Sequence, residues 1–201
     1  MTWTATERYR LEPAPGGLGL VQDLLNTVAA GAPARPDLLA DAAGAQAWAD
    51  AAGTAWAAAT GRPAPHAVLD AGALDELRAL RASLHEAAAR AAQGEDEDAA
   101  PPQVPAPSAP VALRLCGDGV VRLEPEGTGP RTLVALVLAE LYEGQRADTA
   151  RRLKTCRNPL CRVAFYDRSR NNSGAWHDVK TCGNTANLRA YRARQRERQA
   201  P

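Results

Sequence analysis

Apolar residues recur at helical spacing in four stretches of the chain, and this pattern predicts a mainly helical N-terminal body. The strongest pattern lies in residues 70–92, where the apolar stripe consists of Leu74, Leu77, Leu80, Leu84 and Ala88. The Arg, Glu and Asp residues of this stretch lie at other positions, as expected for a helix with one buried face. Further helices are predicted in residues 19–31 and 131–145, and residues 37–53 are predicted to form a short turn followed by a helix.

A second pattern, in which apolar and polar residues alternate, predicts a β-hairpin in residues 111–127. Two alternating runs flank the turn-forming sequence Gly-Asp-Gly at 117–119. Cys116 falls in the first of these strands, where we expect a half-buried thiol that binds no metal. A short strand is also predicted at residues 9–13.

Residues 93–110 combine an acidic run with repeated prolines and contain almost no large apolar side chain. Such a segment cannot bury enough apolar surface to order itself, so a mobile loop is predicted. The whole chain has only 4% aromatic residues and is rich in alanine. Its core must therefore be built mainly from Leu, Val and Ala, packed helix against helix.

The sequence shows none of the signals of a membrane-spanning or exported protein. No apolar run approaches the roughly 18 residues that span a bilayer, and residues 1–13 lack a basic lead and an apolar signal core. We therefore expect a cytoplasmic protein without a membrane partner. In a reducing cytoplasm, clustered cysteines are more often metal ligands or catalytic thiols than disulfides.

The formal net charge of +1 conceals a strong asymmetry between the two ends of the chain. Residues 151–201 contain 13 Lys or Arg and three acidic residues, which gives +10 and leaves −9 for residues 1–150. Such a contrast predicts two domains with different partners, a body at 1–150 and a basic module at 151–201.

Three of the four cysteines and one histidine lie close together in the basic module. Cys156, Cys161, His177 and Cys182 follow the spacing C-x4-C-x15-H-x4-C. Structural zinc is held tetrahedrally by four thiolate or imidazole ligands, commonly as two close pairs with a spacer between them. The spacing therefore predicts one bound Zn²⁺. A catalytic zinc is disfavoured, because four protein ligands leave no open position for water or substrate, and no catalytic residue is identified.

The residues around these ligands indicate how the module folds. Asn-Pro at 158–159 favours the tight turn of a metal knuckle. Residues 163–167 are predicted to form a strand, residues 175–179 a return strand, and the sequence from Cys182 a basic helix. A module this poor in large apolar residues depends on metal binding for its folding energy. The predicted fold class is α+β: a mainly helical body with a β-hairpin, then a small treble-clef-like zinc finger ending in a basic helix.

Four features of the module stand out together: the C-x4-C pair, the AFYDRSRN stretch, the aromatic residue before the third ligand, and the CGN that enters a basic helix. They resemble the CGNR zinc finger of bacterial proteins whose N-terminal part is the ABATE domain, a family named for stress-induced regulation of transcription. Residues 16–28, GGLGLVQDLLNTV, resemble the opening of that domain. Two positions depart from the finger's pattern, since its usual third cysteine is His177 and its final arginine is Thr185. If that arginine touches phosphate or base in the family, this chain has lost one contact.

The basic helix predicted from Cys182 makes the module a candidate for duplex DNA binding. Its arginines 189, 192 and 196 fall within a sector of about 60°. The candidates for phosphate contact are Arg168, Arg170, Lys180, Arg189, Arg192 and Arg196. Base reading is expected from the polar residues near the helix start, Asn184, Thr185 and Asn187. We expect Leu188 and Tyr191 to pack on the strands of the finger.

These observations favour a DNA-binding transcriptional regulator whose finger binds duplex DNA and whose body senses a small-molecule effector or forms a homodimer. Two alternatives stay open. In one, the chain is an enzyme or small-molecule-binding protein with a purely structural zinc. Its candidate ligand-binding residues are Asp23, Asn26 and Thr27, with His66 and His85 as further polar groups. In the other, the finger is a protein-binding adaptor.

Overall fold

The computed structural model describes residues 2–31, 33–93, 107–126 and 129–199. The N-terminal part contains the helices α1 (Thr4–Glu7), α2 (Leu18–Leu25), α3 (Ala42–Thr60), α4 (Ala71–Gln93) and α5 (Pro130–Arg146), and the strands β1 (Val111–Leu115) and β2 (Val121–Pro125). The C-terminal part contains a 3-10 turn (Ala150–Arg152), β3 (Leu153–Thr155), β4 (Ala164–Tyr166), a π-helical turn (Val179–Gly183) and α6 (Asn184–Gln199). The predicted fold class is confirmed: a mainly helical body with a hairpin precedes a small Cys3His region that ends in a helix.

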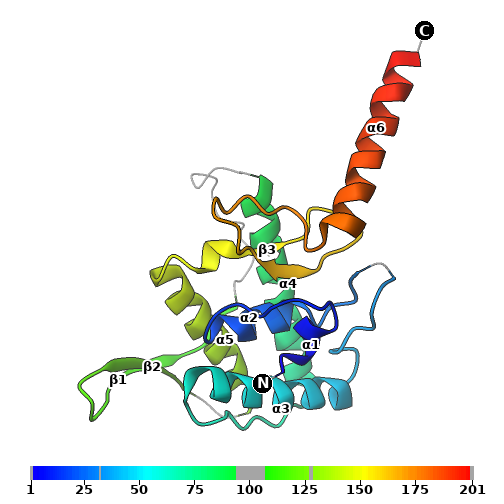
Figure 1. Cartoon of the computed structure of the whole chain (residues 1–201). Helices are drawn as coiled ribbons and strands as arrows, with labels where there is room; N and C mark the ends of the chain where they lie inside the picture. The colour runs from blue at the N-terminus through cyan, green and yellow to red at the C-terminus, as the bar shows by residue number, and fades with distance from the viewer. Residues whose placement is uncertain (1, 32, 94–106, 127–128, 200–201) are drawn as a thin grey trace.

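The helix α2 is the central element of the body. All eight of its residues are buried, and it contacts α1, α3, α4 and α5 (Figure 1). Its residues Leu18, Leu20 and Leu24 share one core with a larger set on the other helices: Trp48 of α3, Leu77 and Leu80 of α4, and Leu136 of α5. Burying one leucine side chain stabilises a fold by roughly 2 kcal/mol, so these few large residues carry much of the body's stability among the many alanines.

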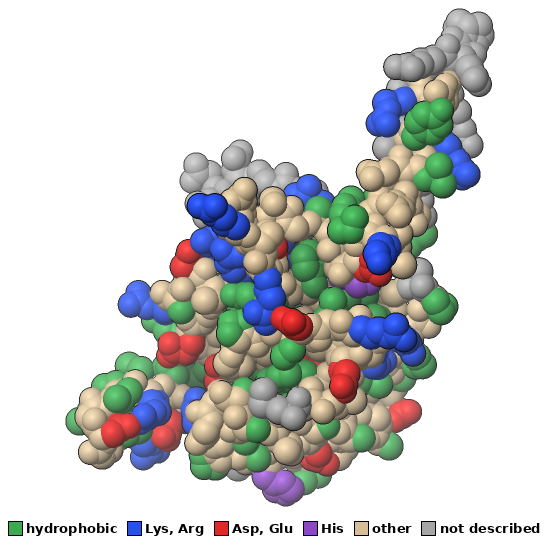
Figure 2. All heavy atoms as spheres, viewed as in Figure 1, with side chains coloured by type: hydrophobic (Ala, Val, Ile, Leu, Met, Phe, Trp, Pro, Cys, Tyr) green, Lys and Arg blue, Asp and Glu red, His purple; other side chains and the backbone are tan. Residues whose placement is uncertain are grey.

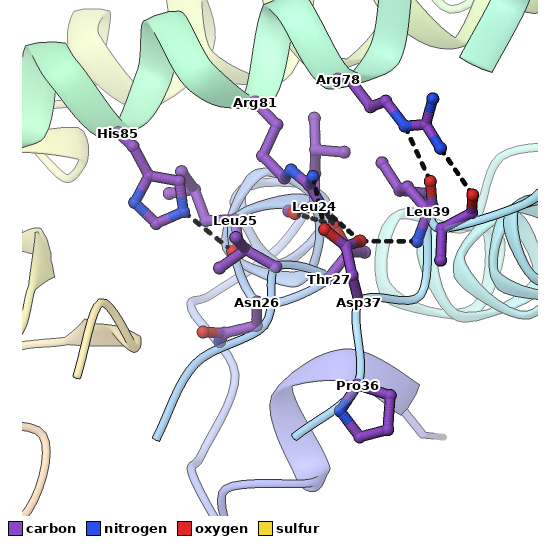
Figure 3. A network of polar contacts seen from close by, with 12 residues as sticks. Leu24, Leu25, Asn26, Thr27, Pro36, Asp37, Leu39, Arg78, Arg81 and His85 are labelled. Carbon is purple, nitrogen blue, oxygen red and sulfur yellow. Dashed lines mark hydrogen bonds and ion pairs between the residues drawn. The ribbon is translucent and has the colours of Figure 1, made fainter. Parts of the chain in front are cut away.

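A row of polar side chains on α4 holds the segment that follows α2 (Figure 3). Arg81 donates to Thr27 Oγ1 at 2.9 Å and forms a two-pronged ion pair with Asp37, with N–O distances of 2.7 and 2.8 Å. Arg78 donates to two carbonyls just before α3, and His85 Nε2 lies 3.0 Å from the carbonyl of the last residue of α2. These contacts satisfy backbone groups at the helix end and fix the segment against α4.

Two helices differ in extent from the prediction. The helix expected at 19–31 ends at Leu25, where the chain turns toward the C-terminal part. The segment 37–53 was expected to be a short turn and then a helix, and the helix does begin after a turn, at Ala42, where the side chain of Asp41 caps it by accepting from Gly44 N at 2.8 Å. It continues to Thr60 and stops before a glycine with φ of 70°. The helices expected at 70–92 and 131–145 are confirmed as α4 and α5.

Two of the predicted strands are wrong. Residues 9–13 form a turn and an extended segment with no strand partner in the described part of the chain, and Arg10 has φ of 56°. Residues 175–179 do not return as a strand, because β4 pairs instead with β3, in the antiparallel register Leu153↔Tyr166 to Thr155↔Ala164. The hairpin predicted at 111–127 is confirmed by the pairing of β1 with β2. Most of the predicted mobile loop, residues 94–106, lies outside the described residues.

The hairpin and α6 project from the body in different directions. In Figure 1 the hairpin extends from the lower left of the molecule and α6 from the upper right. No helix in the described ranges is both long and apolar enough to cross a membrane.

Candidate metal centre

Four side chains that are well separated in the sequence meet at the base of α6. Cys156 and Cys161 lie on either side of a tight turn after β3, His177 lies in the loop after β4, and Cys182 lies in the π-helical turn. Their ligand atoms all lie within 4.8 Å of one another. The three cysteines are buried and the histidine is half-buried.

The local backbone explains why these side chains converge. Cys156 N donates to Val163 O at 2.8 Å, and Cys161 N donates to Asn158 O at 2.8 Å, so the two bonds close the turn that carries the first ligand pair. The Asp178 carboxylate caps the π-helical turn by accepting from Lys180 N at 2.7 Å. This cap begins the turn that carries Cys182 inward.

The donor set fits Zn²⁺. Three thiols and one imidazole are a common ligand set of structural zinc, and tetrahedral Zn–S bonds of about 2.3 Å place neighbouring ligand atoms about 3.8 Å apart. A group whose members all lie within 4.8 Å needs only small adjustments to reach that geometry. Cys161 Sγ already lies 3.3 Å from His177 Nδ1.

The thiols of the first pair strongly affect each other's ionisation. Hydrogen bonding to Cys161, with a further contribution from His177, lowers the pKa of the Cys156 thiol to about 4. The same contact with Cys156, together with burial, raises the pKa of Cys161 above its usual range. Two thiolates at this separation repel each other, and a divalent cation would remove that repulsion by binding both.

Side chains outside the ligand set support the centre. Asn158 Nδ2 donates to Cys182 Sγ at 3.4 Å, which orients the fourth ligand. The carboxylate of Asp167 accepts from Lys154 Nζ at 2.8 Å and from two backbone N–H groups of the loop before His177. Burial would raise the pKa of Asp167, but these hydrogen bonds outweigh burial and hold it well below its usual range. The sequence analysis identified Asn158 as a turn residue but missed its contact with Cys182. It missed Asp167 altogether, although an Asp two residues before Ser favours a side-chain-to-backbone turn.

The centre is attached to the N-terminal segment of the body. Gly31 N donates to Cys161 O at 2.8 Å, and Val28 and Ala30 pack in one apolar cluster with the three cysteines. Asn26 Nδ2 donates to Ala164 O, and its Oδ1 accepts from Ala164 N, both at 2.9 Å. The amide side chain of Asn26 therefore occupies the free edge of β4 as a neighbouring strand would.

The three candidate ligand-binding residues on α2 and just after it are fully buried and bonded to protein atoms. The carboxylate of Asp23 accepts from Thr6 N at 2.7 Å and from Trp48 Nε1 at 2.9 Å, while burial raises its pKa. Asn26 holds β4, and Thr27 accepts from α4 and donates to a carbonyl of α2 at 2.6 Å. The polar groups of these three side chains therefore hold parts of the protein together through hydrogen bonds.

The predicted DNA-binding residues divide into three sets. Arg168 is exposed but contacts the body: its Nε lies 2.8 Å from Glu12 Oε2, and it donates to the Pro13 carbonyl at 2.7 Å. The second set, also exposed, consists of Arg170, Lys180, Asn184, Thr185, Asn187 and Arg192. Arg189 and Arg196 lie on α6, but their side chains lie outside what the structure describes.

The expected packing of Leu188 and Tyr191 on the strands of the finger is wrong. Their exposed fractions are 49% and 54%, because α6 leaves the metal centre and extends away from the body (Figure 1). The outer part of α6 therefore presents both apolar and basic side chains to solvent.

Replacing Cys116 by serine is expected to leave the zinc content unchanged. This thiol lies in the connection of the β1–β2 hairpin, makes a long contact of 3.8 Å with the Arg114 carbonyl, and is not in the ligand group. Elemental analysis of wild-type and variant protein, purified without added metal, checks this. A loss of zinc in the variant would show that the ligand set includes a different cysteine.

Comparison with known families covers nearly the whole of the described chain. Residues 152–195 match the family described as "CGNR zinc finger", and residues 18–152 match the ABATE family, described as "Putative stress-induced transcription regulator". The finger is named after the motif Cys-Gly-Asn-Arg. In this chain Cys182, Gly183 and Asn184 match the first three residues, and Thr185 stands in place of the arginine. No curated protein matches the chain. The ABATE match includes 135 of 201 residues, so this protein belongs to the ABATE family and carries a C-terminal CGNR zinc finger with a Cys3His cluster suited to Zn²⁺.

Proposed function

We propose that this protein is a cytoplasmic, zinc-dependent transcriptional regulator that binds duplex DNA through its C-terminal region. In this proposal, residues 151–201 form the DNA-binding domain, held together by Zn²⁺ on Cys156, Cys161, His177 and Cys182. Residues 1–150 form a body that senses a small-molecule effector or forms a homodimer. The observation that carries the proposal is the geometry of α6, which starts at the metal centre and projects into solvent with basic side chains on it (Figures 1 and 2).

The charge distribution supports contact with phosphate. Residues 151–201 carry a formal charge of +10, from 13 basic and three acidic residues. Some of these basic side chains already contact other parts of the protein, since Arg152 and Lys154 bind the loop after β4 and the exposed Arg168 binds the body. Arg170, Lys180, Arg192 and Arg194 are exposed, and such groups release counterions when they contact the DNA backbone.

The first turn of α6 supplies the groups that could read bases. Asn184, Thr185 and Asn187 are exposed there, and amide side chains match the donor and acceptor pattern of adenine in the major groove. Thr185 lies four residues before Arg189 and therefore on the same stripe of the helix. Its hydroxyl donates to the Thr181 carbonyl at 2.6 Å, so it can still accept a hydrogen bond from a base or phosphate donor.

The affinity for duplex DNA is expected to fall steeply with salt, because phosphate contacts release counterions. Four to six contacts give a log-log slope of about −4 to −5. Replacing Arg189 and Arg192 together by alanine is expected to weaken binding to all sequences alike and to flatten the slope by about 2, if each contacts one phosphate. Fluorescence anisotropy with a labelled duplex over a series of salt concentrations measures both quantities.

A matched control is the double change of Arg35 and Arg90 to alanine. Both side chains are exposed on the body, and the change in net charge is the same. The control is expected to keep the wild-type slope and affinity. The proposal fails if the zinc-loaded protein shows no salt-sensitive binding to duplex DNA at low ionic strength, or if both double variants lose the same affinity.

A cavity beside the metal centre supports the effector-sensing part of the proposal. It has a volume of about 600 Å³ and lies between α4 and the turn of the first ligand pair. Its lining includes His85 from α4 and Arg157 and Arg162 from the zinc-binding region. Burial lowers the pKa of His85 to about 4, so this ring is neutral near pH 7. An effector bound there would contact both parts of the chain.

A further inference from the structure

The β1–β2 hairpin has one apolar face and one polar face. In the antiparallel register, Val111 pairs with Pro125, Leu113 with Leu123, and Leu115 with Val121. Side chains of paired residues lie on the same side of a sheet and alternate along each strand. The apolar hairpin face therefore consists of Val111, Leu113, Leu115, Val121, Leu123 and Pro125.

This apolar face is largely uncovered. The exposed fractions are 74% for Leu113, 71% for Leu115 and 56% for Val121. The hairpin projects from the body at the lower left of Figure 1, and the same projection carries hydrophobic side chains on its surface in Figure 2. Isolated exposed leucines are common in proteins, whereas a continuous apolar face on a projecting element is typical of an interaction site.

The polar face already has its partners within the hairpin. Arg114 forms an ion pair with Glu124 across the two strands, and Arg122 forms one with Asp118 in the turn. These arginines are therefore neutralised, and the hairpin offers little free positive charge to a nucleic acid. The hairpin surface that is left without a partner in the described part of the chain is therefore the apolar hairpin face.

An isolated two-stranded hairpin is at best marginally stable in water, and hairpins persist when further strands or a second layer cover the apolar face. The β1–β2 sheet has two strands, so in the described part of the chain no further strand pairs with either edge. The body supports the hairpin through α5, which contacts β2, and through Arg62, which donates to the Leu123 carbonyl at 3.0 Å. These contacts leave the outer part of the apolar face in water.

We propose that the apolar hairpin face binds the same face of a second copy of this chain and so forms a homodimer. A face without charge is complementary to itself, which is what a two-fold interface requires. Burying one Leu or Val side chain removes on the order of 100 Å² of apolar surface from water. The apolar hairpin face then supplies a few hundred Å² per copy. A specific interface buries on the order of 1,000 Å² in total, so residues at the rim of the apolar hairpin face and the strand edges must supply the remainder.

This proposal specifies the dimerisation role of the body and in that respect rests on the proposed function. The hairpin and α6 extend from different sides of the molecule, so a dimer formed through the hairpins leaves both copies of α6 accessible (Figure 1). Two such helices could contact two half-sites on DNA, and neither hairpin would need to touch the DNA.

Sedimentation equilibrium of the full-length, zinc-loaded protein tests the proposal without DNA. The wild-type protein is expected to have twice the 21.2 kDa mass of one chain at micromolar concentration. Replacing Leu113 and Leu115 together by serine is expected to raise the dissociation constant of the dimer by roughly 100-fold or more, because the two-fold interface loses four leucines. The control is Val120→Ser, which removes an exposed apolar side chain from the connection between the strands, outside the apolar hairpin face, and is expected to leave the dimer intact.

Far-UV circular dichroism and zinc content are expected to match wild type in both variants. A monomeric wild-type protein, or a double serine variant that stays dimeric, would overturn the proposal. Equal dissociation by Val120→Ser would overturn it as well, since the apolar face would then not be the interface. The salt-dependent DNA titration tests the regulator function separately. If the protein is a dimer that does not bind DNA, the regulator function is refuted and the proposed interface is retained. If it is a monomer that binds DNA, the interface is refuted and the regulator function is retained.

Discussion

Replacing Cys156 and Cys182 together by serine is expected to reduce the zinc content from one ion per chain to near zero. The change removes one ligand from each close pair, so neither pair remains to hold the metal. Structural zinc contributes on the order of 10 kcal/mol to the folding of small finger domains. This region has little else to replace that contribution, since its two strands are three residues long and its ligands are the centre of a small apolar cluster.

Loss of the metal is also expected to affect the body, because the two parts share contacts. Val28 and Ala30 pack against the cysteines, and Gly31 donates to the Cys161 carbonyl. Limited proteolysis is therefore expected to cut residues 151–183 of the double variant first and to cut wild type there only after chelation. Elemental analysis supplies the zinc content, with Cys116→Ser as the matched control. Retention of one zinc per chain in the double variant would rule out this ligand set.

Replacing Asn26 by alanine is expected to destabilise the protein by about 3 kcal/mol. The substitution removes both hydrogen bonds to Ala164 at 2.9 Å and leaves the backbone N–H of that buried residue without a partner. An unsatisfied buried polar group costs about 1–3 kcal/mol, and the truncated side chain also leaves a small cavity. The Ala164 carbonyl keeps only a long contact of 3.4 Å with Gln22 Nε2.

Urea unfolding of zinc-loaded protein measures this loss. The control, Asn171→Ala, removes an exposed asparagine in the C-terminal region and is expected to change stability by less than about 0.5 kcal/mol. If Asn26→Ala unfolds within about 1 kcal/mol of wild type, the contact between the body and β4 is not important for stability.

The sequence by itself determined those features that depend on neighbours along the chain. Helix α4 was predictable because its apolar residues repeat every three or four positions. The β1–β2 hairpin was predictable because a glycine-containing turn separates two alternating runs. The grouping of Cys156, Cys161, His177 and Cys182 was predictable because metal ligands occur at short, characteristic spacings. The charge asymmetry is likewise a property of composition alone.

Only the tertiary structure decided the features that depend on residues far apart in the chain. The contact of Asn26 with Ala164 spans 138 residues, and nothing near either residue indicates the other. The partner of β4 is β3, rather than the predicted strand at 175–179, because pairing depends on which segment the metal turn brings alongside. Arg168 faces the body because Glu12 lies beside it. Periodicity shows that a face is apolar, but only the three-dimensional packing shows whether anything covers it. For this reason the buried stripe of α4 could be predicted from sequence, and the exposed apolar face of the hairpin could not.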